Sequence, residues 1–388
     1  VIHLIKVTVF TEMKTISKLS KLSLLVLAAS ACSSPNGHNL TGEIKGLGND
    51  TILVFVNDPV NRKSVKIDTV PVVNNKFSID VPDTSLVSLS IIEKPAGNGA
   101  LRMASNAPFL LLPGEKMKIS GDITNLQASG TEIYDNMSKA QDVLEIENEL
   151  KALNEKFIKA YQSKDEKQVD SLSNISKGLY EEYSKKKLEF IKNNPNSLVA
   201  GYLYTSMKSS DGAEAEKLLG ENVKNGPLAG LIAKTTDNYN KQNAINKAKE
   251  SIKAGMPAPD FKLKNLNNEE MTLSSFKGKY ALLDFWGTWC GWCIKGMPDM
   301  KKYYAKYKDK LEIVGIDCGD TEKKWREGVE EHQLPWTNLY NDKNNDVTVK
   351  YAISGYPTKI LIDPEGKIVD VFVGESEDLY KKLDEMFK

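Results

Sequence analysis

The sequence of 388 residues predicts an α/β domain with a sheet of mixed direction at its C-terminus, preceded by a small antiparallel β-domain and an α-helical region. Three observations predict this order. Short β-rich runs fill residues 40–130, apolar residues recur at three- to four-residue steps over 131–253, and strands alternate with helices over 255–388. With 40% hydrophobic and 27% charged residues, the composition is that of globular domains, and the length fits two or three of them.

The charge balance and the cysteine count exclude two classes of protein. The chain has 52 Lys and Arg residues and 52 Asp and Glu residues. It therefore lacks the excess positive charge that is typical of nucleic-acid-binding proteins. The four cysteines, Cys32, Cys290, Cys293 and Cys318, are too few for a disulfide-rich scaffold. Each cysteine therefore needs its own explanation.

Residues 1–32 are predicted to comprise upstream residues and a lipoprotein-type signal. From Met13 the chain carries a basic lead, and then a run of about ten apolar or small residues that is too short to span a bilayer but suits an export signal. A cysteine directly after small residues resembles the lipobox of bacterial lipoproteins, in which the thiol of Cys32 would be acylated; Ala29 departs from the usual Leu. We therefore expect an exported, lipid-anchored protein on the periplasmic side of a bacterial membrane, where disulfides persist. An ordinary signal peptide with Cys32 incidental is the alternative.

The β-domain and the helical region carry no pattern that looks catalytic. Between residues 40 and 130, strands separated by turns at ten- to fifteen-residue spacing predict a sandwich-like domain without a cluster of His, Cys or carboxylate. Over 131–253, Lys and Glu fill the outward positions of amphipathic helices, and "NNPNS" at 193–197 interrupts them. Both regions are interpreted as packing or docking modules.

The C-terminal domain is predicted from 255 to 388. Its strands and helices alternate and then end in a hairpin, which implies a sheet of mixed direction. The expected elements are strands at 280–285 and 311–317, helices at 291–309 and 322–332, a short helix near Val347, a hairpin of 358–363 with 367–373, and a helix at 377–387.

Cys290 and Cys293 follow a strand and lie where a helix should begin. A helix N-terminus favours a thiolate, so Cys290, expected to be exposed at the cap, is the candidate nucleophile. Cys293, one turn inside, is placed to attack a mixed disulfide. Structural zinc would need two further ligands at short spacing, and an inert disulfide across so small a loop constrains the unfolded chain little. Redox exchange is the favoured interpretation.

Two further residues stand near this pair in the predicted topology. Asp284 interrupts the apolar strand "LLDFW", where burial should raise its pKa and make it a proton acceptor for Cys293, unless it faces water at a sheet edge. Cys318 ends the strand "LEIVGIDC", where it could approach the site, although a bystander thiol is the simpler interpretation.

"DFWGTWCGWC", together with "PAPDF" before it and "YPT" and "ILIDPEGKIV" after it, resembles the thioredoxin superfamily, and more narrowly the TlpA/ResA-like periplasmic thiol-disulfide oxidoreductases. The resemblance covers 255–388. It implies a thioredoxin fold, with Pro357 as a cis-proline facing the cysteines, Tyr356 beside it on the substrate-binding loop, and Asp284 as the buried acid. Residues 294–297 lack the Glu that many ResA-like members place after the second cysteine.

The resemblance implies disulfide exchange with protein substrates and an unknown redox partner, without cofactor or metal. Trp289 and Trp292 would border Cys290 as an apolar surface for substrate, while Trp286 is expected in the core. Gly291 and Trp292 lie between the sulfurs and match neither reducing thioredoxins nor strong oxidants, so the direction of exchange, whether reduction, oxidation or isomerisation, stays open.

Two alternatives to disulfide exchange remain. One is an AhpC/TSA-type peroxidase, which shares the fold. It needs Pro and Thr six and three residues before its cysteine, where this chain has Asp284 and Gly287. The other is a lipid-anchored binding protein whose β-domain recognises a ligand and whose redox domain is accessory.

Overall fold

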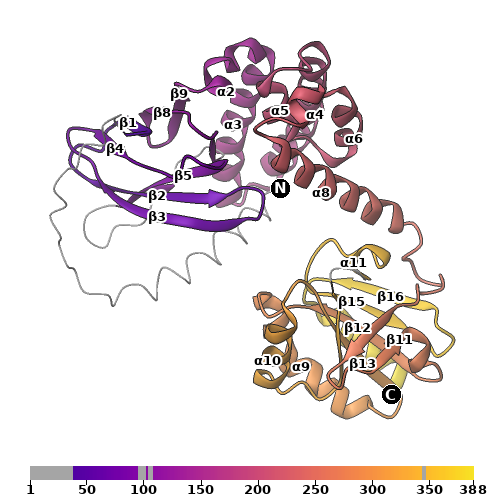
Figure 1. Cartoon of the computed structure of the whole chain (residues 1–388). Helices are drawn as coiled ribbons and strands as arrows, with labels where there is room; N and C mark the ends of the chain where they lie inside the picture. The colour runs from indigo at the N-terminus through magenta and orange to yellow at the C-terminus, as the bar shows by residue number, and fades with distance from the viewer. Residues whose placement is uncertain (1–37, 95–101, 104–107, 343–346) are drawn as a thin grey trace. The chain divides into compact units, whose positions relative to one another are not determined.

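The computed structural model describes residues 38–94, 102–103, 108–342 and 347–388 (Figure 1). The predicted signal and Cys32 lie outside the described residues. Among the residues that are described, no helix is both long and apolar enough to cross a membrane. The chain forms two compact units, of which the first contains the β-domain and the second contains the helical region and the α/β domain.

The β-domain consists of two sheets. One has the strand order β4-β1-β8-β9, and the other has the order β3-β2-β5-β6 with β7 also paired to β5. The strands are β1 (Leu40–Lys45), β2 (Thr51–Asp58), β3 (Lys63–Pro71), β4 (Lys76–Ile79), β5 (Val87–Lys94), β6 (Arg102–Met103), β7 (Phe109–Leu111), β8 (Met117–Asp122) and β9 (Asn125–Ser129).

The expected antiparallel order holds for most of these pairs but not for all. β1 runs parallel to β8, with Leu40 opposite Met117. These partners are 77 positions apart in the sequence, and a turn pattern read along the chain cannot reveal a pairing between distant strands. The predicted turn at "VNN" is present, since Asn74 and Asn75 take φ values of 50° and 66° between β3 and β4.

The helical region follows the predicted periodicity. Its longest helices, α3 and α4, are consecutive and packed together. Asp165 caps α4 by accepting a hydrogen bond from the Gln168 N–H, and α4 ends at the predicted break, after which Ser197 caps the next helix. The helices are α2 (Glu132–Asp135), α3 (Gln141–Gln162), α4 (Glu166–Asn193), α5 (Leu198–Tyr204), α6 (Ser209–Leu218), α7 (Glu221–Lys224) and α8 (Ala229–Ala248), with a 3₁₀ turn at Met137–Ala140.

The α/β domain is built on a seven-stranded sheet of order β11-β10-β14-β13-β12-β15-β16. β12, β13 and β14 are parallel, whereas β15 runs antiparallel to β12 and pairs with β16 as the predicted hairpin. The elements are β10 (Lys262–Asn265), β11 (Glu270–Thr272), a 3₁₀ turn at Leu273–Phe276, β12 (Tyr280–Trp286), α9 (Gly291–Tyr307), β13 (Leu311–Asp317), α10 (Glu322–Glu331), β14 (Thr337–Tyr340), α11 (Val347–Lys350), β15 (Thr358–Ile362), β16 (Ile368–Val373) and α12 (Glu377–Phe387).

The two faces of this sheet carry different helices. Leu282 and Trp286 of β12 belong to a cluster with residues of α9, α10 and α12. Leu283 and Phe285 alternate to the other face, where they pack with α11 and the segment that leads into β10. The fold is the predicted thioredoxin fold. Sequence patterns missed β10, β11 and β14, which are only three or four residues long.

Truncating Leu283 should destabilise this domain. Its side chain is fully buried on the central strand, so Leu283→Ala is expected to lower the free energy of unfolding by about 2–5 kcal/mol. All five tryptophans lie in the α/β domain, so tryptophan fluorescence during denaturation reports this transition. Leu266→Ala, at a side chain that is 38% exposed, is the control and should change stability by less than about 0.5 kcal/mol. Equal losses in both variants would contradict the assigned core.

Candidate active site

Cys290 and Cys293 form a disulfide at the N-terminus of α9, with their Cα atoms 5.3 Å apart. Cys290 is the N-cap of the helix, and its sulfur accepts a hydrogen bond from the Cys293 N–H at 3.2 Å. After reduction, the same N–H and the positive end of the helix dipole would stabilise a thiolate on Cys290. The predicted placement of the pair at a helix start is thus present in the structure.

The exposure expected for Cys290 is wrong in this disulfide form. Cys290 is 6% exposed and Cys293 3%, and both belong to the cluster on the α9 face of the sheet. Tyr356 packs against that cluster. A cap position leaves the backbone N–H groups of the first turn open, but it does not prevent neighbouring aromatic rings from covering the sulfur.

Aromatic side chains border the disulfide. Trp292 is 62% exposed and Trp289 44%, while Trp286 is fully buried as expected. The Trp289 ring meets the Tyr356 ring edge-on with centroids 5.0 Å apart, and its Nε1–H donates to the Cys318 carbonyl at 2.9 Å. Tyr356, which the resemblance places on a substrate-binding loop, is therefore in contact with the cysteine loop.

Glycines lie on both sides of Cys290. A Cβ at Gly287 would lie 2.5 Å from Trp289 Nε1, so this position admits the folded-back indole only because it has no side chain. Gly291 has open space where its Cβ would be. The Tyr356–Pro357 peptide bond is cis, as predicted.

A second contact fastens the loop and was missed by the sequence analysis. The Thr288 N–H and hydroxyl both donate to the Asp320 carboxylate at 2.7 Å. Nearby, burial and then the negative charge of Asp320 raise the pKa of Asp317 to about 8. The "DCGD" run that begins with the last residue of β13 was the available signal, because two acids at the end of a buried strand need a partner.

Asp284 is buried rather than at a water-facing edge. It is 3% exposed and lies on the central strand, on the α9 face by alternation with Leu282 and Trp286. Burial is the main cause that raises its pKa to about 6; Lys359 lowers the pKa and Glu375 raises it. A carboxyl with this pKa can accept a proton near neutral pH.

Lys359 and Glu375 surround Asp284, and sequence analysis gave neither a role. Lys359 is the cross-strand partner of Asp284, and its Nζ lies 3.8 Å from Asp284 Oδ1 and 2.9 Å from Glu375 Oε2. A lysine inside "TKILID" was a detectable signal, because it interrupts an apolar strand as Asp284 does. Glu375 follows the last strand and gave no comparable signal.

Cys318 is a separate buried thiol, 3% exposed, whose sulfur donates to the Ile316 carbonyl at 3.5 Å. It belongs to the cluster on the sheet face opposite to that of the disulfide. Among the described residues, no group of three or more His, Cys, Asp or Glu side chains is arranged to hold a metal ion.

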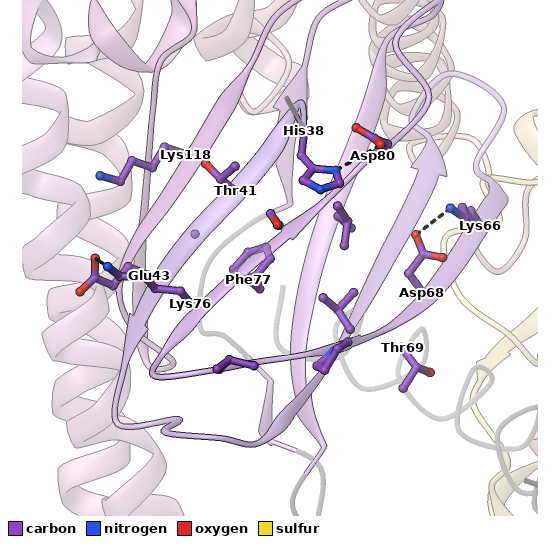
Figure 2. A pocket seen from close by; sticks show the side chains of 16 residues that line it. His38, Thr41, Glu43, Lys66, Asp68, Thr69, Lys76, Phe77, Asp80 and Lys118 are labelled. Carbon is purple, nitrogen blue, oxygen red and sulfur yellow. Dashed lines mark ion pairs between the residues drawn. The ribbon is translucent and has the colours of Figure 1, made fainter. Parts of the chain in front are cut away.

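The β-domain contains a separate hollow of about 920 Å³ (Figure 2). It is lined by residues of β1, β3 and β4, with ion pairs from Lys66 to Asp68 at 3.0 Å and from His38 to Asp80 at 3.2 Å. With Lys76 and Glu43 at 4.0 Å as a third pair, six of the titratable side chains in it are paired with one another. Figure 2 shows the Phe77 ring within this surface.

Comparison with known proteins finds family matches for the C-terminal domain and for the β-domain. Residues 254–371 match the AhpC/TSA family, and residues 38–137 match a domain of unknown function (DUF4369). The thiol-disulfide oxidoreductase ResA of Bacillus cereus is 38% identical over 128 residues, which are 33% of this chain and 73% of ResA. The thioredoxin-like protein YneN of Bacillus subtilis is 34% identical over 165 residues, 40% of this chain and 96% of YneN.

Solved structures match over the same share of the chain. The thioredoxin domain of a thiol-disulfide oxidoreductase from Bacteroides vulgatus is 36% identical and covers 35% of this chain and 98% of that domain, with a TM-score of 0.33. The chain belongs, through its C-terminal domain, to the ResA-like thiol-disulfide oxidoreductases of the thioredoxin superfamily.

Proposed function

We propose that this chain exchanges disulfides with protein substrates through its Cys-Gly-Trp-Cys pair, with Cys290 as nucleophile, Cys293 as resolving thiol and Asp284 as proton acceptor. The observation that carries the proposal is the disulfide at the N-terminus of α9, combined with a buried carboxyl on the sheet face that α9 covers. The N-terminus of the helix stabilises the Cys290 thiolate that starts the reaction. The Asp284 carboxylate can accept the proton of Cys293, the thiol that completes it.

In the reducing direction, the Cys290 thiolate attacks a substrate disulfide. One substrate sulfur leaves as a thiolate and the other joins Cys290 in a mixed disulfide. Cys293 then loses its proton to Asp284 and attacks Cys290, which forms the Cys290–Cys293 disulfide and releases the second substrate sulfur. Two electrons have passed from the protein to the substrate, and the reverse sequence oxidises a dithiol.

The exposed surface beside Cys290 suits an extended protein segment. Trp289 and Trp292 supply apolar area, and the ring of Trp289 is held at one edge by Tyr356 and at its nitrogen by a backbone carbonyl. Fixed aromatic rings contact a partner at little cost in side-chain entropy. Pro357 and Gly291 would border the same contact.

The match to the AhpC/TSA family makes peroxide reduction the second candidate. Asp284 and Gly287 stand where a peroxidase needs Pro and Thr. The next residue has a hydroxyl, but Thr288 already donates that hydroxyl to Asp320. Disulfide exchange is therefore favoured, and peroxide consumption by the reduced protein separates the two activities.

Replacing the nucleophile should abolish exchange without unfolding the domain. Cys290→Ser is expected to lose insulin reduction in the presence of a thiol reductant, because serine is not nucleophilic at neutral pH. Cys318→Ser is the matched control and should retain activity, since its sulfur lies on the other sheet face. Circular dichroism verifies folding, and full activity in Cys290→Ser would exclude the mechanism.

Asp284→Asn should slow resolution and stabilise the protein. At pH 7 we expect the attack of Cys293 on a mixed disulfide to slow by about 10²-fold, the usual contribution of a general base. The wild-type rate should fall as the pH drops through about 6, because Asp284 becomes protonated. The rate of the variant should not fall in this pH range. Rapid-mixing fluorescence measures both profiles.

The stability effect of Asp284→Asn has a defined pH window. The folded pKa lies above the ordinary 3.8, so the native state binds the proton more tightly and loses stability as the pH rises from about 4 to about 6. Asn removes that penalty, which amounts to roughly 3 kcal/mol. The variant should melt higher than wild type at pH 8 and equally at pH 4; a lower Tm at both would contradict the assignment.

We further propose an exported protein that is held at the periplasmic side of a membrane by a lipid on Cys32. What supports this is the sequence alone: a basic lead, a short apolar run and small residues before the cysteine. Cys32→Ser should move the protein from the membrane fraction to the soluble fraction of expressing cells, because the acyl acceptor is lost. An unchanged distribution would refute lipidation at this residue.

A further inference from the structure

Two opposite charges face each other in the interior of the α/β domain. Asp284 and Lys359 are register partners on the antiparallel strands β12 and β15, and they are 3% and 2% exposed. Their neighbours Leu282, Trp286 and Leu361 on alternate positions pack against α9, so both charges point to the face that α9 covers. Burying two charges is expensive unless each is well paired.

The lysine is not shared equally between its two partners. Lys359 Nζ hydrogen-bonds to Glu375 Oε2 at 2.9 Å, whereas its 3.8 Å separation from Asp284 Oδ1 is too long for a hydrogen bond. Within the described part of the chain, Asp284 Oδ1 accepts no hydrogen bond. Glu375 is held further by Tyr380, whose hydroxyl donates to Oε1 at 3.2 Å. Glu375 thus accepts a hydrogen bond at each of its two oxygens, whereas Oδ1 of Asp284 is left open.

The helix that carries the cysteines makes room for this arrangement. Gly296 lies one turn after Cys293 on the buried face of α9. A Cβ at position 296 would overlap the Glu375 carboxylate. Glycine normally destabilises a helix interior, so its presence here is explained by the carboxylate that occupies the space.

The titratable groups around the cluster come from every neighbouring element. Lys359 faces Asp284 from β15, Glu375 reaches in from the segment after β16, Tyr380 comes from α12, and Cys293 belongs to α9. Asp299, also on α9, acts on Tyr380. The pKa of Asp284 responds to two of these groups in opposite directions, because Lys359 lowers it and Glu375 raises it.

We infer that Lys359 and Glu375 are positioning residues for Asp284: Glu375 draws the Lys359 ammonium away, which leaves a carboxylate oxygen of Asp284 open to accept the Cys293 proton. The inference rests on the proposed function of Asp284. When Cys293 attacks, its proton passes to that oxygen, the new S–S bond forms to Cys290, and the substrate sulfur leaves with its electron pair. The unit of two carboxylates and one ammonium then changes from a net charge of −1 to zero.

Substitution of the two positioning residues should shift the titration of Asp284 in opposite directions. In Glu375→Gln the ammonium is free to bind Asp284, so its pKa should fall, by about one pH unit. In Lys359→Met the ammonium that lowers the pKa of Asp284 is gone, so this pKa should rise by about one pH unit or more. Carboxyl ¹³C shifts of the reduced full-length chain, labelled at Asp and assigned with Asp284→Asn, measure this directly.

The pH at which the attack of Cys293 on a mixed disulfide slows in acid should shift together with the pKa of Asp284. Glu375→Gln is expected to be about tenfold faster, relative to its own plateau, than Lys359→Met at pH 6. Glu377→Gln and Lys381→Met, at exposed positions of α12, are matched controls that should leave both profiles unchanged. A purely structural role for the cluster would instead slow both test variants without opposite shifts. Unmoved profiles, or shifts of the same sign, overturn the inference.

Gly296→Ala tests the geometry while it keeps all three charges. The new Cβ should expel the Glu375 carboxylate, so the variant is expected to lower the Tm and to lower the pKa of Asp284, as Glu375→Gln does. In a Glu375→Ala background the same substitution should raise the Tm, because only the helix preference for alanine remains. A change in Tm of the same sign in both backgrounds would contradict the proposed contact. These Tm measurements test the inference even where a charge variant does not fold.

The experiments distinguish a failure of the proposed function from a failure of the inference about Lys359 and Glu375. If wild-type protein does not reduce insulin but the carboxyl titrations shift oppositely, the proposed function fails and the charge arrangement stands. If the protein is active but the titrations do not move, Asp284 works without Lys359 and Glu375, and the inference fails alone.

Discussion

The charge pair buried between β12 and β15 constrains much of the α/β domain. Burying a carboxylate and an ammonium in a low-dielectric interior is costly. Here Lys359 hydrogen-bonds to Glu375 and lies 3.8 Å from Asp284, so the arrangement uses residues of β12, of β15 and of the segment after β16. The hairpin of β15 and β16 must keep its register for Lys359 to face Asp284, and the segment that follows it must return Glu375 to the sheet. α9 must present a glycine at the contact. The helix that carries the disulfide is therefore fitted to the charges beneath it.

The opposite side of the disulfide obeys a different constraint. There the loop before α9 is fastened by Thr288 to Asp320, and the Trp289 ring is held by Tyr356 and a backbone carbonyl. These contacts are polar or edge-on aromatic, lie near the surface and leave Gly291 and Trp292 open. A protein partner can reach this side, whereas the acid below α9 is closed to solvent.

Short sequence patterns predicted those features of the structure that depend on residues close to one another in the chain. The strand-to-helix placement of Cys290 and Cys293, the burial of Trp286 and the hairpin after Pro357 all follow from short patterns, and the structure confirms them. The parallel pairing of β1 with β8, the cover over Cys290 and the approach of Glu375 to Gly296 depend on contacts between distant segments. Asp284 was found because it interrupts an apolar strand. Lys359 interrupts one equally and could have been found by the same argument.

The geometry separates control of rate from control of direction. Thiol-disulfide equilibria depend on how well the reduced pair stabilises a thiolate, and that is decided mainly at the N-cap by the N–H of Cys293 and by the residues between the sulfurs. In the proposed mechanism the rate of the second step depends on removing a proton from Cys293, and the proposed acceptor, Asp284, lies on β12 at the sheet face that α9 covers. Substitutions at Gly291 or Trp292 therefore act mainly on the potential, and substitutions at Lys359, Glu375 or Gly296 act mainly on the rate of resolution. In this proposal the Gly-Trp dipeptide sets the direction of electron flow without disturbing Asp284, the proposed proton acceptor on the other side of α9.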